Sequence, residues 1–316
     1  DRDMMLMPSP VTHVTGYVNG IELPFFTDTN VLLMESWIVD RAVELIETHQ
    51  ATTCVSSTPF LRELVDAARH QGKDLPSFRL FACGGAAVPS ALIYEASEVL
   101  ASCRAVRVYG STEVPLVTVG FVGEGETQLA AETDGRVCNY EVRICDDDGK
   151  EVCLNVDGGI WVRGSAMMQG YRDADQNAAA FSEDGFFKTG DIGQMLESQA
   201  IVITDRKKDI IIRGGENLSA REIEEVVMLH PAVAEAAAVS APHARLGEGV
   251  AVFVTLYEGD APGLSDLTAL CAEQRLANQK WPQWLGVLEE MPKTPSGKIQ
   301  KAVLRQKLQA EAVQLS

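Results

Sequence analysis

Strand-like and helix-like segments alternate through residues 43–113, and this order constrains the fold more than any other feature of the chain. β-rich runs end in turns that contain proline or glycine, and segments with apolar residues at helical spacing lie between them. The strand-like runs are "ATTCVSSTP", "FRLFACGGAAVP" and "RAVRVYGSTE", and the helical segments are "VELIETHQ", "FLRELVDAARH" and "SALIYEASEVLA". Such an order predicts a largely parallel sheet, with ligand-binding groups at the carboxyl ends of its strands.

The rest of the chain predicts a small antiparallel β region followed by a compact α+β module. Short apolar runs separated by Gly and Asp turns fill residues 135–204. Beyond residue 209, the capping box Ser219-Ala220-Arg221-Glu222 predicts a helix that Pro231 ends, with one face made of Ile223, Val226, Val227 and His230. We therefore expect an α/β protein with three parts: a partial large domain (1–134), its β subdomain (135–207) and a small α+β domain (208–316).

The acidic balance of the chain limits its partners. A net charge of -18 over 316 residues argues against sequence-independent nucleic-acid binding, which needs concentrated positive charge. An anionic ligand is still permitted, because a few local cations and backbone N–H groups can hold one. No apolar run reaches the roughly 18 residues of a membrane span. Seven cysteines without zinc-like spacing predict free thiols in a reducing cytoplasm.

The segment "KTPSGKIQK" (293–301) contains a Gly-Lys pair in a loop-prone setting. A phosphate-binding P-loop needs G-x-x-x-x-G-K followed by Ser or Thr. Here Pro292 stands at the first glycine position and Ile299 follows Lys298, so the P-loop interpretation fails. From the residues alone, a basic loop before a C-terminal helix and a lysine held for a chemical step both stay open.

Four other segments carry groups that suit a nucleotide, and each also has a purely structural explanation. In "VYGSTE", the Ser111 and Thr112 hydroxyls can contact phosphate and Glu113 can hold Mg²⁺, but a strand end with a helix cap explains them equally. The glycines of "CGGAAVP" suit a flat ligand or a tight β–α turn. Asp191, expected in a tight turn of "KTGDIG", suits ribose hydroxyls or the turn itself. In the stretch 204–225, a charged turn, an apolar strand, a Gly-Gly loop and a capped acidic helix follow in close order, and a hairpin feeding a helix, with solvated charges, is the structural explanation.

The order of these segments is more specific than any one of them. "VYGSTE", "GGIWVRG…MMQGYR", "FFKTGDIG", "DRKKDIIIRGGENLSAREIE" and "PKTPSGKIQK" follow one another along the chain. Together they resemble the running signature of the adenylate-forming superfamily, which includes acyl-CoA synthetases, luciferases and peptide-synthetase adenylation domains. The resemblance covers essentially the whole chain. Within that superfamily, "MPSPVTHVTGY", "RKKDIIIRGGEN" and "PKTPSGKIQK" are most similar to medium-chain fatty acid or cyclohexanecarboxylate CoA ligases.

The resemblance implies an ATP-dependent acid–thiol ligase. The family joins a carboxylate to the α-phosphate of ATP and then passes the acyl group to a thiol, usually that of coenzyme A. The first step gathers negative charge around phosphorus, which positioned cations and N–H donors must offset. The implied ligands are a small carboxylic acid, ATP, Mg²⁺ and coenzyme A.

Matched to the family's motifs, residues of the predicted large domain receive roles. Thr112 would bind phosphate, and Glu113 would hold Mg²⁺. Tyr109, in the same turn as Gly110, would flank adenine and one wall of the acyl pocket together with the turn Gly84-Gly85-Ala86. His13 matches an aromatic-or-His position beside the carboxylate, whereas the sequence by itself favours a packed loop residue. The apolar setting of these groups suggests a hydrophobic monocarboxylic acid.

Other matched residues lie further along the chain. Asp191 and Arg206 would bind the ribose hydroxyls. Lys298 matches the adenylation lysine, which suits a compact charge on a flexible stem. Lys208 matches the hinge about which the C-terminal domain rotates after adenylation. That rotation would remove Lys298 and bring Gly214 and Gly215 to the site, where they would leave room for the pantetheine arm.

One motif of the family is missing from the sequence. The Ser/Thr/Gly-rich phosphate loop should precede His13, and no such loop occurs in these 316 residues, which open with Asp1-Arg2-Asp3. We therefore expect either a truncated chain or a second polypeptide that supplies the rest, and poor binding of ATP phosphates by this chain alone. Two alternatives stay open: an adenylation enzyme that loads a carrier-protein thiol, and an inactive remnant or interaction domain. A homodimer also stays open.

Overall fold

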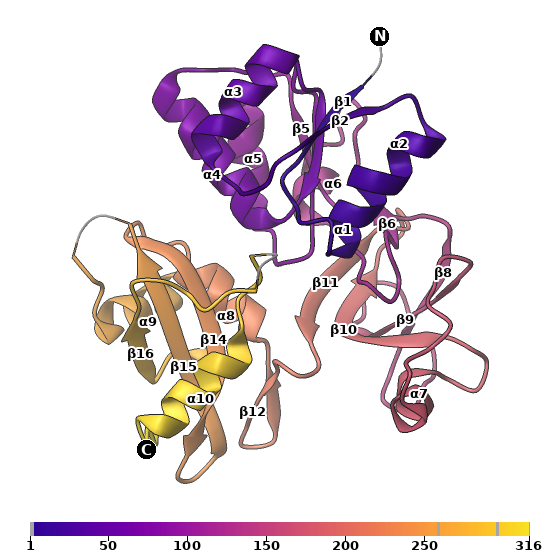
Figure 1. Ribbon diagram of the computed structural model, residues 1–316. Coiled ribbons are helices and arrows are strands. Elements are labelled where there is room, and N and C mark those ends of the chain that lie inside the picture. The colour runs from indigo at the N-terminus through magenta and orange to yellow at the C-terminus, as the bar shows by residue number, and fades with distance from the viewer. Residues whose placement is uncertain (1–2, 258–259, 295–296, 316) are drawn as a thin grey trace. The chain divides into compact units, whose positions relative to one another are not determined.

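The computed structural model describes residues 3–257, 260–294 and 297–315, and the chain divides into two compact units (Figure 1). The first unit consists chiefly of Asp1–Thr189 and Gly193–Ile203. The second consists chiefly of Thr204–Thr294 and Lys298–Ser316, together with Gly190–Ile192. The predicted boundaries after residues 134 and 207 stay predictions.

A five-stranded parallel sheet forms the centre of the first unit, as the alternating sequence predicts. Its strand order is β2-β1-β3-β4-β5, and every neighbouring pair is parallel. Most of its side chains are buried, because helices cover the sheet and leave its strands little contact with water. The strands are β1 (Met4–Met7), β2 (Asn30–Leu33), β3 (Thr53–Ser56), β4 (Leu80–Cys83) and β5 (Arg104–Arg107).

Three helices supply most of the core beside this sheet: α3 (Val39–His49), α4 (Thr58–Gln71) and α5 (Ser90–Val99). Figure 1 shows them gathered along one side of the strands. Leu61 and Leu64 of α4 are fully buried, in agreement with the apolar spacing of that segment. The shorter helices of this unit are α1 (Val14–Tyr17), a π-helical turn (Val18–Glu22), α2 (Leu23–Phe26) and α6 (Thr127–Glu132).

A four-stranded sheet of order β11-β10-β9-β8 follows in the chain. Strands β8 (Tyr140–Cys145) and β9 (Gly158–Gly164) are antiparallel, and β10 (Phe187–Met195) and β11 (Ile201–Arg206) complete the sheet. A small ladder of β6 (Thr118–Val119) and β7 (Arg136–Val137) lies before it. The sequence did not reveal helix α7 (Ala174–Ala180), because none of its residues is buried and an apolar face is therefore lacking.

The second unit is built around long antiparallel strands. Strands β14 (Val233–His243) and β15 (Gly247–Leu256) pair along their length. On the side of β15 away from β14, β16 (Trp284–Val287) pairs with it in parallel, and β12 (Ile211–Arg213), which forms a hairpin with β13 (Glu216–Leu218), pairs with its beginning. The helices are α8 (Ala220–Val227), α9 (Leu264–Glu273), a 3-10 turn (Asn278–Lys280) and α10 (Lys301–Ala310). The predicted order from charged turn to strand, Gly-Gly loop and capped helix is confirmed.

The details of α8 differ from the prediction. Ser219 caps it, since its side chain accepts a hydrogen bond from Glu222 N at 3.1 Å. The Glu222 carboxylate instead pairs with Lys280 Nζ at 2.5 Å, so the reciprocal half of the capping box is replaced by an ion pair. The helix ends at Val227, and a turn rather than helix leads to Pro231, because His230 N already bonds Val227 O at 3.1 Å.

No helix in the described ranges is long and apolar enough to cross a membrane.

Candidate active site

Within the first unit, three predicted segments follow the carboxyl ends of strands in one sheet. His13 lies beyond β1, Gly84 lies directly after β4, and Tyr109 lies just beyond β5. Strand β3 joins β1 to β4, and β4 pairs with β5, so these strand ends share one edge of the sheet. This is the edge at which parallel α/β sheets bind ligands.

The turn after β4 is crowded by the neighbouring strand. Gly84 N donates to Ser56 O at 3.1 Å, and a Cβ atom at position 84 would lie 2.5 Å from the carbonyl oxygen of Val108. Gly85 has a φ of 79°, in the left-handed region that glycine adopts without strain. Chain packing therefore requires the glycine at 84, which supports the tight-turn explanation at that residue.

The turn after β5 holds Tyr109 tightly. Tyr109 is 7% exposed, and its backbone N–H donates to Thr118 Oγ1 at 2.8 Å. A Cβ atom at Gly110 would lie 2.5 Å from Leu116 N, so the chain also folds closely on itself there. The backbone of Tyr109 is thus held in place. A residue whose ring flanks a flat ligand needs such a fixed backbone.

Glu113 accepts hydrogen bonds on both carboxylate oxygens. Ser111 Oγ donates to Oε2 at 2.8 Å, and the Tyr171 hydroxyl donates to Oε1 at 2.9 Å. Burial, followed by the bond to Glu113, raises the pKa of Tyr171 to about 12. Tyr171 belongs to "MMQGYR", but no local pattern predicts that its hydroxyl contacts a carboxylate 58 residues away. Thr112 is exposed between these groups.

The donor set around Glu113 fits magnesium bound through a substrate. Mg²⁺ in phosphate-transferring sites commonly takes one or two carboxylates, with phosphate oxygens and waters completing its shell. The described residues contain no group of three or more His, Cys, Asp and Glu arranged to hold a metal. A magnesium ion at Glu113 would therefore depend on a bound phosphate for most of its remaining ligands.

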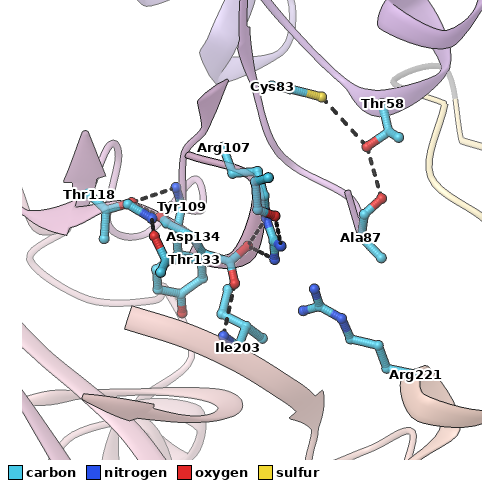
Figure 2. Close-up of polar contacts among 12 residues, drawn as sticks. Thr58, Cys83, Ala87, Arg107, Tyr109, Thr118, Thr133, Asp134, Ile203 and Arg221 are labelled. Carbon is cyan, nitrogen blue, oxygen red and sulfur yellow. Dashed lines mark hydrogen bonds and ion pairs between the residues drawn. The ribbon is translucent and has the colours of Figure 1, made fainter. Parts of the chain in front are cut away.

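A buried ion pair that sequence reasoning missed lies beneath the β5 turn (Figure 2). Arg107 Nη2 lies 2.6 Å from Asp134 Oδ1, and the two side chains are only 3% and 8% exposed. Asp134 Oδ2 accepts from Ile203 N at 2.9 Å, while Arg107 Nη1 donates to Ala131 O at 2.9 Å. The only hint in the sequence is a cation inside the apolar run "RAVRV".

Thr118 connects this ion pair to Tyr109. Its hydroxyl accepts from Tyr109 N and donates to the backbone carbonyl of Asp134 (Figure 2). Thr118 is fully buried, so neither bond competes with water. The position of Tyr109 is therefore linked to a buried charge pair through one hydroxyl group.

His13 has a clear structural role. It is the N-cap of α1, where its Nδ1 accepts from Thr15 N at 3.3 Å, and its side chain is half-buried. Gly16, in the same short helix, is pressed so closely against Pro10 O that a Cβ would lie 2.2 Å away. Capping holds the imidazole at the sheet edge, and its role beside a carboxylate stays a prediction.

Asp191 and Arg206 form a pair in the second unit. Arg206 Nε lies 2.5 Å from Asp191 Oδ1, and the carboxylate is 5% exposed while the guanidinium side chain is 46% exposed. Asp191 lies within strand β10, not in the tight turn expected for it; Gly190 before it takes the positive φ of 77°. Lys207 N donates to Gly190 O at 2.8 Å, which fixes the adjacent chain.

The remaining predicted residues of the second unit lie in turns and in one loop. Gly214 and Gly215 form the tip of the β12–β13 hairpin with φ values of 59° and 88°, as two-residue hairpin loops of type I′ require. Lys208 is exposed in the turn between β11 and β12. Lys298 lies in a loop closed by Thr294 N to Lys298 O at 2.8 Å and Lys298 N to Thr294 Oγ1 at 3.1 Å. Pro295 and Ser296 of that loop lie outside the described residues.

Family models match both units of the chain. The AMP-binding enzyme model matches residues 1–172, which is more than half of the chain, and the model of the AMP-binding enzyme C-terminal domain matches residues 222–298. The chain belongs to the AMP-binding enzyme family. This confirms the resemblance to the adenylate-forming superfamily and the expected fold class.

Individual relatives of this AMP-binding enzyme include ligases. It is 33% identical over 319 residues to the medium-chain fatty-acid–CoA ligase of Escherichia coli K12, covering 99% of this chain and 55% of that protein. Its structure is similar to that of amide bond synthetase McbA from Marinactinospora thermotolerans, with a TM-score of 0.87, 29% identity and coverage of 97% and 63% of the two chains.

A further similar structure is O-succinylbenzoate coenzyme A synthetase from Bacillus subtilis in complex with ATP and magnesium ion. The TM-score is 0.82, with 28% identity and coverage of 97% of this AMP-binding enzyme and 61% of that chain. The chain therefore spans about half the length of the curated relatives that it matches.

Proposed function

We propose that the AMP-binding enzyme acts, within its full chain, as an ATP-dependent acid–thiol ligase for a hydrophobic monocarboxylic acid. The observation that carries this proposal is the turn after β5, where Tyr109, Thr112 and Glu113 follow a parallel strand at the ligand-binding edge of the sheet. The family membership and the E. coli medium-chain fatty-acid–CoA ligase support the reaction class.

In the proposed first step, the acid carboxylate attacks the α-phosphorus of ATP, and pyrophosphate leaves with the electron pair of the broken P–O bond. Thr112 donates to a phosphate oxygen, and Tyr109 lies against adenine. The exposed guanidinium of Arg206 and the buried carboxylate of Asp191 contact the ribose hydroxyls. Lys298 neutralises charge that develops between the two anions, which is most effective where water is excluded. His13 orients the acid carboxylate.

Magnesium fits this step through Glu113. Bound there, it would neutralise phosphate charge as a Lewis acid. Tyr171 and Ser111 orient the Glu113 carboxylate by donating to its two oxygens. The high pKa of Tyr171 keeps its hydroxyl protonated, and so a donor, across the neutral range.

In the proposed second step, the thiolate of coenzyme A attacks the acyl carbon and AMP leaves. Rotation at Lys208 would exchange Lys298 for the Gly214-Gly215 hairpin tip. That tip has no Cβ atoms, and space beside Gly215 is open within the described structure. We propose a cytoplasmic location, which agrees with seven unpaired cysteines; the homodimer stays a prediction.

The decisive test uses the full chain with saturated straight-chain and cyclohexane carboxylic acids. We expect carboxylate-dependent exchange of pyrophosphate into ATP, followed by formation of a coenzyme A thioester. Absence of exchange with every hydrophobic acid tested would remove the ligase proposal and favour the inactive remnant.

The role of Lys298 has its own test. Lys298→Ala should lower acyl-adenylate formation at least about 100-fold because it removes a cation used in the transition state, yet it should spare thioester formation from supplied acyl-adenylate. Lys307→Ala, an exposed lysine of α10, is the matched control. Equal loss of both half-reactions in Lys298→Ala would exclude this role.

The hinge is tested by Lys208→Pro. Proline fixes φ near about -65° and should therefore trap one domain orientation. We expect one half-reaction to survive and the other to fail; full activity in both would remove the hinge assignment.

A carrier-protein thiol is the second candidate acceptor. The similarity to the 2,3-dihydroxybenzoate–AMP ligase of Bacillus subtilis, which is 34% identical over 290 residues, favours keeping it, because the name of that relative gives AMP and not coenzyme A. Transfer to the phosphopantetheine of a carrier protein, with none to coenzyme A, would establish this alternative.

A further inference from the structure

Helix α10 follows the loop that carries Lys298 and also reaches the proposed hinge. Lys301 and Arg305 lie four residues apart on it, a spacing that places two side chains on the same helix face. Leu304 and Leu308 are each 1% exposed and pack with Ala237 and Phe253 of the central strands. The apolar face therefore fixes the helix to the core of the second unit, while Lys301 and Arg305 can contact other segments.

Arg305 connects α10 to the hinge turn. Its Nη2 donates to Asp209 Oδ1 at 2.8 Å and to the carbonyl oxygen of Lys208 at 3.3 Å. Asp209 is only 8% exposed, and its N–H donates to Arg206 O at 2.8 Å. One guanidinium thus holds both the side chain and the backbone of the turn in which rotation is proposed.

Lys301 connects the other end of α10 to α8. Its Nζ lies 2.7 Å from Glu224 Oε1, which also accepts from Ala238 N at 2.7 Å. Burial raises the pKa of Glu224, and the charge of Lys301 opposes that rise. Removal of either partner would therefore leave a charge in a poorly solvated place.

The opposite stem of the Lys298 loop is held in a similar way. Lys293 Nζ pairs with Glu235 Oε1 at 2.8 Å. Across the loop, Gln300 N donates to Pro292 O at 2.7 Å and Gln300 Nε2 donates to Lys293 O at 2.8 Å. Lys301 and Lys293 thus fix both stems to the same α8–β14 framework, at positions three residues after and five residues before Lys298.

From these contacts we infer that α10 is a strut that makes the hinge turn and the Lys298 loop one rigid body, with Arg305 and Lys301 as positioning residues. When the chain rotates at Lys208, the Lys298 loop then moves together with α10 and keeps its position relative to it. The inference rests on the proposed two-step function. It matters because a misplacement of about 1 Å in a reacting group can cost about 100-fold in rate.

The activity test uses Arg305→Met in the full chain. Methionine keeps the helix propensity and much of the side-chain length but removes both hydrogen bonds. We expect acyl-adenylate formation to fall about tenfold, because Lys298 loses its fixed position. Thioester formation from supplied acyl-adenylate should be unchanged. Arg305→Lys should restore most of the lost rate, and Lys307→Met is the control on the same helix.

Hydrogen–deuterium exchange supplies a readout that does not require activity. In Arg305→Met, faster exchange is expected at Asp209 and Ile210 and also at Thr294 and Gln300, whose N–H groups donate within the Lys298 loop before α10. Faster exchange at the hinge turn alone would overturn the strut. Equal loss of both half-reactions, or loss of neither, would also overturn it. A full wild-type chain without adenylation would instead refute the proposed function, while the exchange result would still decide whether α10 joins the two segments.

Discussion

Two arginine–aspartate pairs in this protein use the same chemical groups in opposite surroundings. In the first unit, Arg107 and Asp134 are 3% and 8% exposed. In the second unit, Asp191 is similarly buried at 5%, but Arg206 is 46% exposed. Only the second pair therefore presents a guanidinium group to solvent.

The difference separates a structural pair from a candidate binding pair. The Arg107 guanidinium has protein acceptors in Asp134 and Ala131, and Asp134 also accepts from the backbone of Ile203. These bonds hold the end of β5 against two later segments of the chain. Arg206 fixes the direction of one aspartate oxygen while much of its own surface stays hydrated. Burial of the cation, more than the presence of the pair, distinguishes the two roles.

The strongest way to break this comparison is Asp134→Ala. It leaves the Arg107 charge buried without its carboxylate, and we expect the free energy of unfolding to fall by about 3–5 kcal/mol. Denaturant unfolding followed by Trp37 and Trp161 fluorescence measures this. Asp184→Ala, which removes the half-exposed partner of Arg143, is the control and should cost no more than about 1 kcal/mol. A matching small loss in Asp134→Ala would show that burial does not set the strength of the pair.

Thr118→Val tests the connection from the buried pair to Tyr109. The substitution keeps the shape but leaves Tyr109 N–H and the Asp134 carbonyl without the hydroxyl, at a cost of about 2 kcal/mol. Thr118→Ser retains the hydroxyl and should recover most of that loss in the same unfolding experiment. If Thr118→Ser lowers stability as much as Thr118→Val, restoring the hydroxyl does not restore stability, and the two hydrogen bonds alone do not account for the loss.

Asp191→Ala should change the free energy of unfolding by only about 1 kcal/mol, because the Arg206 side chain is 46% exposed and water can solvate it in the variant. The larger consequence is expected in binding: titration calorimetry of the full chain with ATP should show affinity lowered at least about tenfold, as ribose hydrogen bonds are lost. Unchanged ATP affinity together with a large loss of stability would make this pair as structural as the one at Arg107.

The smallest effect is expected at Tyr171, whose contact with Glu113 involves a neutral donor. Since the folded state favours the protonated phenol, the contribution to stability is fully present below about pH 10 and is lost as pH rises toward 12. Absorbance titration should show one phenol with a pKa of about 12, and Tyr171→Phe should remove that titration step. Retention of that component in the variant would assign the high pKa to another of the six tyrosines.

The sequence predicted those parts of the fold that depend on local pattern. The parallel sheet follows from repeated strand, turn and helix signals, and the hairpin feeding α8 follows from Gly214-Gly215 and Ser219. Side-chain partners could not be predicted in the same way: Arg107 and Asp134 are 27 residues apart, and Tyr171 and Glu113 are 58 apart. Such pairs are determined by how strands are placed side by side. The end of α8 was predicted wrongly because proline stops a preceding helix from continuing through it but does not require that helix to reach it.

The Val108 carbonyl beside Gly84 limits which residues can stand at position 84 of this turn. Any side chain at position 84 would force apart the ends of two adjacent strands, since even a Cβ atom would approach that oxygen to 2.5 Å. A saturation library selected for folding alone should therefore retain glycine there as strictly as one selected for the proposed ligase activity. If related sequences always carry glycine at this position, the reason would be crowding between the two strands. Replacement of that glycine in an inactive relative would indicate that folding, and not only catalysis, has been lost.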